Sequence, residues 1–364
     1  MEATFVNVDE LRLGKVIAED IFANTQYPIV YKNTKINYEH IQILKAFQIH
    51  KIPVLIDSIM ELQETDVEIE QEQEIDIPQA KTYSFEHYYN DAITLFQKDF
   101  RNWEAGARID ITKVRNSMLP LIEYILENRQ YIYKLADYSI PKDYMYHHCV
   151  ATGLIAAVIA QKIGLDKGTC IQMAIAGTLA DSGMAKIPAK IREKKGTLVE
   201  SEFNEIRKHP LYSYQLVKDL PAMKAEMKEA ILKHHERIDG SGYPLREKIA
   251  SEKHYSQIIA VADVFHAMTT ERLYRSKQSP FKVVEMIKEE EFGKYDIQVV
   301  QALLDLVVDL PIGTQVELSN LERGEVIFNN QYAPTRPMVR LITSGDILDL
   351  ASVRSFHIAR ILDI

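Results

Sequence analysis

Apolar residues recur at helical spacing through most of the middle of the chain. In residues 84–135, Ile93, Phe96 and Phe100 follow one another at three- and four-residue intervals, which predicts helices with an apolar face. Residues 150–163 predict an amphipathic helix that ends at Gly164, because glycine commonly follows the last turn of a helix. Further helices are predicted at 171–179, 201–208, 223–234 and 258–268. The chain is therefore expected to be mainly α-helical.

The two ends of the chain show a different pattern. Near the N-terminus, β-prone pairs such as Val16-Ile17 surround one short helical stretch, and from Pro311 onwards short β-prone runs alternate with turn residues. These patterns predict a small α/β module followed by a helical domain and a small β-rich module. The expected boundaries are 1–57 for the N-terminal α/β module, 58–83 for an acidic connector, 84–140 for a helical linker, 141–310 for the helical domain and 311–364 for the β-rich C-terminal module.

Composition narrows the class of protein. The net charge of −9 and the pI near 5.7 argue against a partner with a polyanionic surface, either nucleic acid or an anionic membrane. The longest uninterrupted apolar run, Leu154 to Ala160, is too short to span a bilayer. The first residues are acidic and contain no apolar signal core. We therefore expect a cytoplasmic protein.

The candidate chemistry is concentrated in the stretch KHHERIDGSGYP, from Lys233 to Pro244. Adjacent histidines followed by carboxylates form a mixed nitrogen and oxygen ligand set suited to a divalent transition metal. Asp263 lies in an otherwise almost wholly apolar helix, where a carboxylate is costly unless it is paired or binds a cation. In a bundle, facing helices can bring distant ligands together. Six candidate metal ligands follow: His148, Asp181, His209, His234, His235 and Asp263.

Three segments resemble the HD-GYP family of bacterial metal-dependent phosphodiesterases, which hydrolyse cyclic di-GMP. They are HHERIDGSGYP, the segment VADVFHAMTTERLYR from Val261 to Arg275, and the segment from Lys186 to Pro210. The resemblance covers roughly residues 144–305 and implies an HD-type helical bundle. It also implies that the six candidate ligands hold iron or manganese ions, with Asp181 binding the catalytic metals and their water. Arg272 and Arg275 would contact the substrate phosphates, and Tyr243 would shape the substrate pocket.

The sequence departs from the family pattern at four positions and in one loop, where LREKIAS, from Leu245 to Ser251, replaces the glycine-bearing loop that usually follows GYP. The defining His-Asp doublet reads Ala180-Asp181, and the lysine expected shortly after it is Met184. An acidic ligand found in some members falls at Tyr144, and the second aspartate of the VADxxDA segment is His266. Losing an imidazole ligand predicts one ion fewer or weaker metal binding. Losing the lysine removes a transition-state contact that is worth roughly 3 kcal/mol when preorganised.

Three functions follow as hypotheses. The first is a degenerate HD-GYP regulator that binds cyclic di-GMP, a related cyclic dinucleotide or a signalling partner, with weak or no hydrolysis. The second is an active phosphodiesterase with a reduced metal centre, in which His266 or a water replaces the missing ligand. The third is a dimeric scaffold or partner-binding protein. Arg272 and Arg275 argue against the third, and Ala180 and Met184 argue against the second. The long helices of residues 84–135 also predict a homodimer.

Overall fold

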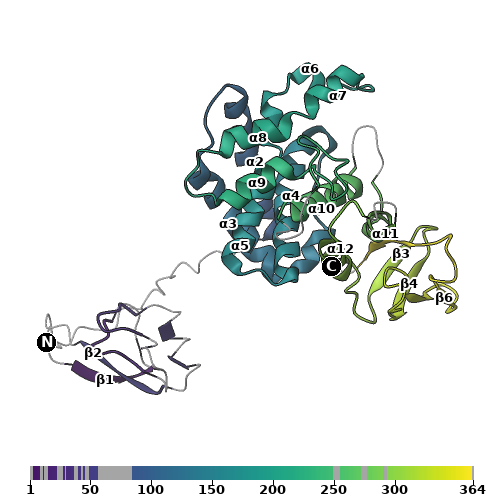
Figure 1. The fold of residues 1–364 in the computed structure, drawn as a ribbon. Coiled ribbons are helices and arrows are strands. Elements are labelled where there is room, and N and C mark those ends of the chain that lie inside the picture. The colour runs from purple at the N-terminus through teal and green to yellow at the C-terminus, as the bar shows by residue number, and fades with distance from the viewer. Residues whose placement is uncertain are drawn as a thin grey trace, which may run out of the picture. The chain divides into compact units, whose positions relative to one another are not determined.

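The chain divides into two compact units, Met1–Gln79 and Ala80–Ile364 (Figure 1). In the first unit, β1 (Ala3–Asn7) pairs antiparallel with β2 (Lys51–Leu55). Its small core includes the buried residues Ile17, Leu44 and Val54. The predicted acidic connector lies outside the described residues. The computed structural model describes residues 3–8, 11, 15–22, 28, 30–36, 40–41, 44–45, 49–55, 84–248, 255–271, 277–289 and 293–362.

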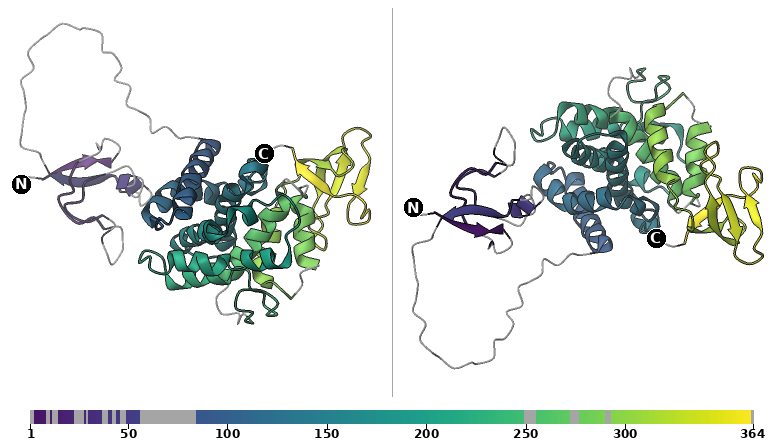
Figure 2. Two further views of the ribbon diagram at one scale, coloured as in Figure 1. Left: turned by 90° about the horizontal axis from the view of Figure 1, so that it is seen from above. Right: turned by 90° about the horizontal axis from the view of Figure 1, so that it is seen from below.

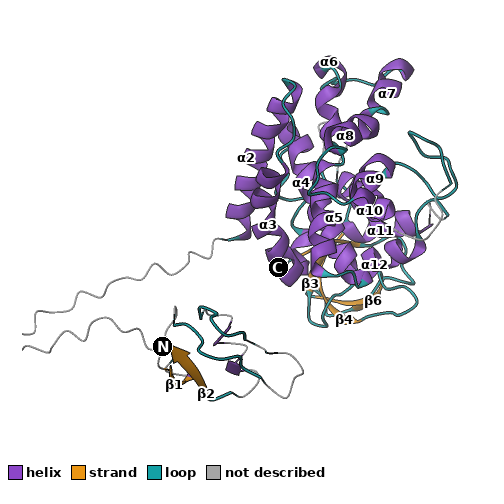
Figure 3. Cartoon of the chain, turned by 60° about the vertical axis from the view of Figure 1, so that its left-hand side comes forward, coloured by secondary structure: helices purple, strands orange, loops and turns teal. Residues whose placement is uncertain are grey.

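The second unit is a helical bundle that carries a β-sheet, which confirms the predicted mainly α fold (Figure 3). Its long helices are α2 (Phe85–Glu104), α3 (Ile111–Glu127), α4 (Tyr144–Ile163), α5 (Lys167–Leu179), α8 (His209–Val217), α9 (Ala225–Lys233), α10 (Tyr255–Thr269), α11 (Pro280–Glu289) and α12 (Ile297–Val307). The shorter ones are α6 (Ala189–Arg192), α7 (Glu200–Ile206) and three 3₁₀ segments, η2 (Arg129–Tyr133), η3 (Pro141–Asp143) and η4 (Ser182–Lys186).

Helix α4 is the centre of the bundle. Every residue from His147 to Ala160 is buried, because α3, α5, α10 and α12 all pack around the helix. The prediction of an amphipathic helix is therefore wrong: α4 has no solvent-exposed polar face over this span. It begins at Tyr144, six residues before the predicted start, and ends as predicted at Gly164, whose φ of 96° is left-handed.

Glycines allow α4 and α5 to approach each other closely. A Cβ atom added to Gly153 would lie 2.1 Å from the Thr178 hydroxyl oxygen and 2.4 Å from the Ala174 carbonyl oxygen. On the facing helix, a Cβ added to Gly177 would lie 2.9 Å from the Gly153 Cα. The site residues that follow α5 depend on this spacing, because α5 leads directly into Asp181.

We expect Gly153→Ala to lower the free energy of unfolding by about 1–3 kcal/mol, since the added methyl group overpacks a helix contact made partly by backbone. The melting temperature should fall by at least about 3 °C, measured by calorimetry or circular dichroism. Gly196→Ala is the matched control, because a Cβ there meets no heavy atom within 4 Å. Equal melting temperatures for the two variants would contradict the close packing.

Helices α2 and α3 belong to the same hydrophobic core as the rest of the bundle. Their buried residues, among them Phe96, Trp103, Met118 and Leu121, pack in one cluster with α4 and α5. Residues 84–140, predicted as a separate linker, thus lie within one compact unit with the helical domain. The apolar faces of α2 and α3 are covered inside the chain, and homodimerisation remains a prediction.

A five-stranded antiparallel sheet forms the C-terminal module, as predicted, and lies against the bundle near α11 (Figure 2). Glu285 on α11 accepts hydrogen bonds from Thr335 and Arg336, which attach the sheet to the bundle. Among the described residues, no helix is long and apolar enough to cross a membrane. The strands are β3 (Gln315–Leu318), β4 (Arg323–Phe328), β5 (Met338–Leu341), β6 (Ile347–Asp349) and β7 (Ile358–Ile361), in the order β6-β5-β4-β3-β7.

Candidate metal centre

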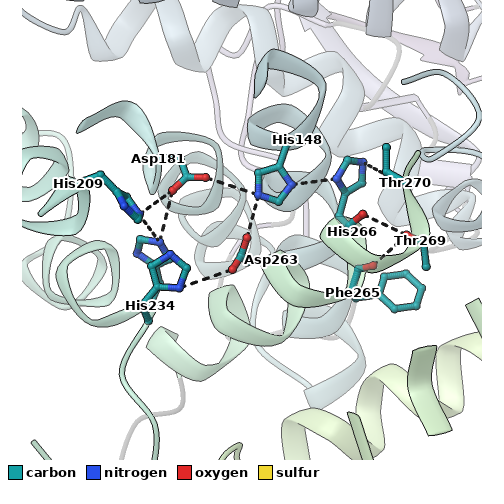
Figure 4. A network of polar contacts seen from close by, with 10 residues as sticks. His148, Asp181, His209, His234, Asp263, Phe265, His266, Thr269 and Thr270 are labelled. Atoms are coloured by element: carbon teal, nitrogen blue, oxygen red, sulfur yellow. Dashed lines mark hydrogen bonds and ion pairs between the residues drawn. The ribbon is translucent and has the colours of Figure 1, made fainter. Parts of the chain in front are cut away.

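The six predicted metal ligands come together in the core of the bundle (Figure 4). They form two groups, and within each group the ligand atoms all lie within 4.8 Å of one another. Asp181 is common to both groups. The first group contains Asp181, His209, His234 and His235, and the second contains His148, Asp181 and Asp263.

Different helices supply these side chains. His148 lies inside α4 and Asp263 inside α10, whereas Asp181 follows the end of α5. His209 is the first residue of α8, and His234 and His235 directly follow α9. The ligands therefore sit inside helices and at helix ends, where the packing of the bundle determines their distances.

Asp181 lies between the two groups. Its Oδ1 is 2.9 Å from Nε2 of His209 and 3.6 Å from Nε2 of His234, while its Oδ2 is 3.5 Å from Nε2 of His148. Burial by itself raises the pKa of Asp181. The charge and hydrogen bond of His209, with smaller effects of His234 and His148, outweigh burial and hold the pKa well below its usual range. Asp181 is thus an ionised carboxylate that faces both groups.

Asp263 is the second carboxylate of the site. Its Oδ1 is 2.8 Å from Nε2 of His148, and its Oδ2 is 3.7 Å from Nδ1 of His235. Burial raises the pKa of Asp263, but the hydrogen bond with His148 and the nearby His235 lower it by more, so the net direction is downwards. The apolar helix around Asp263 thus surrounds an aspartate whose two oxygens both face imidazoles.

The histidine tautomers fit a cation. Nδ1 of His209 is 2.8 Å from the Ile206 carbonyl oxygen, and Nδ1 of His234 is 2.7 Å from the Ile231 carbonyl oxygen. A carbonyl oxygen only accepts, so Nδ1 of each ring carries a proton, and Nε2 is the ring nitrogen that faces Asp181.

The two Nε2 atoms lie 3.4 Å apart. Burial, and next the neighbouring His234, lower the pKa of His235 well below its usual value. Converging lone pairs and a carboxylate are the donor set of a divalent metal.

The glycine-rich turn after the histidines is held against the site. Glu236, fully buried, accepts hydrogen bonds from the backbone N–H groups of Leu245 and Arg246 at 2.5 and 3.0 Å. Gly242 is required there, because a Cβ would lie 2.4 Å from the His235 carbonyl oxygen. The turn brings the Tyr243 ring onto the His235 ring, with 4.6 Å between the ring centroids. Tyr243, the predicted pocket residue, therefore contacts a metal-ligand candidate.

Arg207 is a neighbour of the site that the sequence did not single out. Its guanidinium lies 4.4 Å from the Phe203 ring centroid and 5.6 Å from that of Tyr243. Its Nε is buried and has no hydrogen-bond partner among the residues that the structure describes. Arg207 lies two residues before the candidate ligand His209, and this closeness in sequence is the signal that could have identified it. The predicted phosphate-binding residues Arg272 and Arg275 lie outside the described residues.

Of the four positions at which the sequence analysis expected other residues, Ala180, Met184 and His266 are buried and Tyr144 is half-buried. Ala180 and Met184, at the two positions where the resemblance led us to expect a histidine and a lysine, are both buried. Lys186 does not restore that charge, because its Nζ donates to the Trp103 carbonyl oxygen. The Tyr144 ring stacks on His148, with 5.2 Å between centroids. His266 contacts His148 rather than joining either ligand group. His266, which was predicted to replace the histidine expected at position 180, therefore lies outside both ligand groups.

Comparisons with known proteins agree with this architecture. The family model described as HD domain matches residues 123–299. Over 246 residues the chain is 27% identical to a cyclic di-GMP phosphodiesterase of Pseudomonas aeruginosa, covering 68% of this chain and 59% of that protein. Over 165 residues it is 32% identical to a 3'3'-cGAMP-specific phosphodiesterase of Vibrio cholerae, covering 44% and 37%.

A solved structure supports the same fold. An HDG"Y"P protein from Bdellovibrio bacteriovorus aligns with a TM-score of 0.50 at 15% identity, over 84% of this chain and 99% of that one. Residues 123–299 thus match the HD-domain model, the sequence is similar to that of cyclic di-GMP phosphodiesterases, and the fold is similar to that of the Bdellovibrio protein. It spans about three-fifths of the length of the Pseudomonas relative and less of the Vibrio one.

Proposed function

We propose that this chain is a metal-dependent phosphodiesterase that hydrolyses a cyclic dinucleotide, with cyclic di-GMP as the first candidate. The observation that carries the proposal is the position of Asp181, which belongs both to the four-ligand group and to the three-ligand group. This is the arrangement that two neighbouring metal ions require. The names of the Pseudomonas and Vibrio relatives support the substrate class and leave the choice between cyclic di-GMP and 3'3'-cGAMP to experiment.

Each residue has a definite part in this proposal. The four-ligand group would hold one iron or manganese ion, and His148, Asp181 and Asp263 the other, with one ligand fewer because of Ala180. When bound, paired ions supply Lewis-acid activation of the phosphodiester and lower the pKa of water. Tyr243 lines the approach to the ligands. Burial and then the nearby carboxylates of Asp263 and Asp181 raise the pKa of its phenol, so Tyr243 stays a hydrogen-bond donor.

A regulator that binds the nucleotide with weak or no hydrolysis is the second candidate. The buried Ala180 and Met184 favour it, because they remove one imidazole and one ammonium from the same end of the site. Such a protein would retain the four-ligand group and respond to nucleotide through a signalling partner. The convergence of six metal-ligand side chains makes a purely structural scaffold the weakest of the three functions.

One experiment separates these functions. The full chain is purified without oxygen, its iron and manganese are measured by elemental analysis, and hydrolysis of cyclic di-GMP and 3'3'-cGAMP is then followed with added Mn²⁺. Two ions per chain with linear product formation support the phosphodiesterase. One ion with nucleotide binding but no product supports the regulator. Protein that takes up neither metal contradicts both, and a chelator-treated sample is the control.

A further inference from the structure

Two buried side chains extend the ligand network away from Asp181. Nδ1 of His148 lies 3.0 Å from Nδ1 of His266, and Nε2 of His266 lies 3.2 Å from the Thr270 hydroxyl oxygen (Figure 4). His266 and Thr270 are each 1% exposed. His266 lies on α10 one turn beyond Asp263, and Thr270 directly follows the end of that helix. The three side chains therefore form a chain of contacts shielded from water.

The direction of the hydrogen bonds in this chain follows from the ligand role of His148. Its Nε2 faces Asp263 and Asp181, so binding a metal there requires an unprotonated Nε2 and a proton on Nδ1. That proton needs an acceptor, and the atom in reach is Nδ1 of His266. His266 can accept only if its own proton is on Nε2, from where it donates to the Thr270 hydroxyl.

Two of the other candidate ligands have backbone acceptors for their Nδ1 protons. His209 and His234 donate their Nδ1 protons to the carbonyl oxygens of Ile206 and Ile231. In the metal-binding tautomer, His148 would instead donate its Nδ1 proton to the side chain of His266. Which nitrogen of His266 carries a proton depends in turn on Thr270. The metal-binding tautomer of His148 therefore depends on His266. If His266 carries its own proton on Nδ1, it cannot accept the proton of His148.

We infer that His266 and Thr270 are positioning residues that hold His148 in its metal-binding tautomer, through hydrogen bonds from His148 to His266 and from His266 to Thr270. Removing the Thr270 hydroxyl takes away the acceptor that lies 3.2 Å from the buried Nε2 of His266, and losing an acceptor is costly for a buried N–H group. His266 then shifts its proton from Nε2 to Nδ1. Nδ1 of His148 and Nδ1 of His266 would then both carry protons, so no hydrogen bond could form between them. The inference rests on the metal centre proposed above.

Thr270→Val is expected to weaken Mn²⁺ binding by about tenfold, the lower end of the effect of losing an outer-shell partner of a metal ligand. Affinity is measured on the full chain by competition with a fluorescent chelator. Thr269→Val is the matched control, because Thr269 is equally buried and its hydroxyl bonds only to backbone carbonyl oxygens of Phe265 and His266. That variant should bind Mn²⁺ as the wild type does.

Testing Thr270→Val in a His266→Asp background distinguishes control of the His148 tautomer from an effect of Thr270 on packing. A carboxylate at position 266 accepts the His148 proton without help, so Thr270→Val should have no effect on Mn²⁺ affinity in a His266→Asp background. An equal loss in both backgrounds, or no loss in either, overturns the inference. Failure of the wild type to bind Mn²⁺ instead overturns the metal centre itself.

Nitrogen NMR gives a readout that needs no variant. With ¹⁵N-labelled histidine and diamagnetic Zn²⁺ as the probe, His266 should show a protonated Nε2 and a bare Nδ1. A protonated Nδ1 on His266 in the zinc-loaded protein would contradict the proposed direction, whatever the affinities of the variants.

Discussion

Asp181→Asn is expected to abolish binding of both metal ions and to lower cyclic dinucleotide hydrolysis by about a thousandfold or more. Asp181 is the one residue common to both ligand groups, and each of its oxygens faces a different set of imidazoles. An amide of the same shape removes the negative charge and turns an NH₂ group towards one of the two groups. Paired metals contribute several kcal/mol of transition-state stabilisation, and each 1.36 kcal/mol is tenfold in rate.

The measurement is metal content and initial rate on the same preparation, with melting temperature as the check on folding. Asp305→Asn is the control, because Asp305 on α12 accepts a hydrogen bond from Gln301 and belongs to neither ligand group. It should retain metal and activity. If Asp181→Asn keeps two ions per chain, the two groups do not form one centre and the proposed function loses its main support.

Ala180→His combined with Met184→Lys is expected to raise hydrolysis by about a hundredfold and to strengthen binding of the second ion. Position 180 directly precedes Asp181 and is buried, so a histidine there is adjacent to the three-ligand group. A fourth ligand strengthens a metal site. An ammonium near the phosphate is worth roughly 3 kcal/mol when preorganised, and this figure sets the upper limit of the gain.

Packing works against this gain. A histidine in place of a buried alanine overpacks the core at a cost of about 1–3 kcal/mol, so the variants are compared at a temperature where all remain folded. Met184→Leu keeps the volume without the charge and should leave the rate unchanged. A folded double variant with full metal content and no increase in rate would mean that Ala180 and Met184 do not limit hydrolysis.

Local sequence patterns were sufficient to predict part of the site and part of the fold. The stretch from Lys233 to Pro244 predicted metal-ligand chemistry because the spacing of histidine, carboxylate and glycine is local, and the turn at Gly242 follows from that local sequence. The helical class, the β-rich end and the helix end at Gly164 were predictable for the same reason, since periodicity and turn residues act over short distances.

Long-range packing decided the rest. His148 and Asp263 are 115 residues apart, and the 2.8 Å between their side chains depends on how α4 and α10 pack. Hydrophobic periodicity reports an apolar face but not what covers it. It therefore missed the complete burial of α4 and assigned α2 and α3 to a linker. The sequence determined which residues are candidate metal ligands in this protein. The tertiary structure decided that Asp181 joins two groups and that His266 lies behind a ligand, because these relations exist only between distant helices.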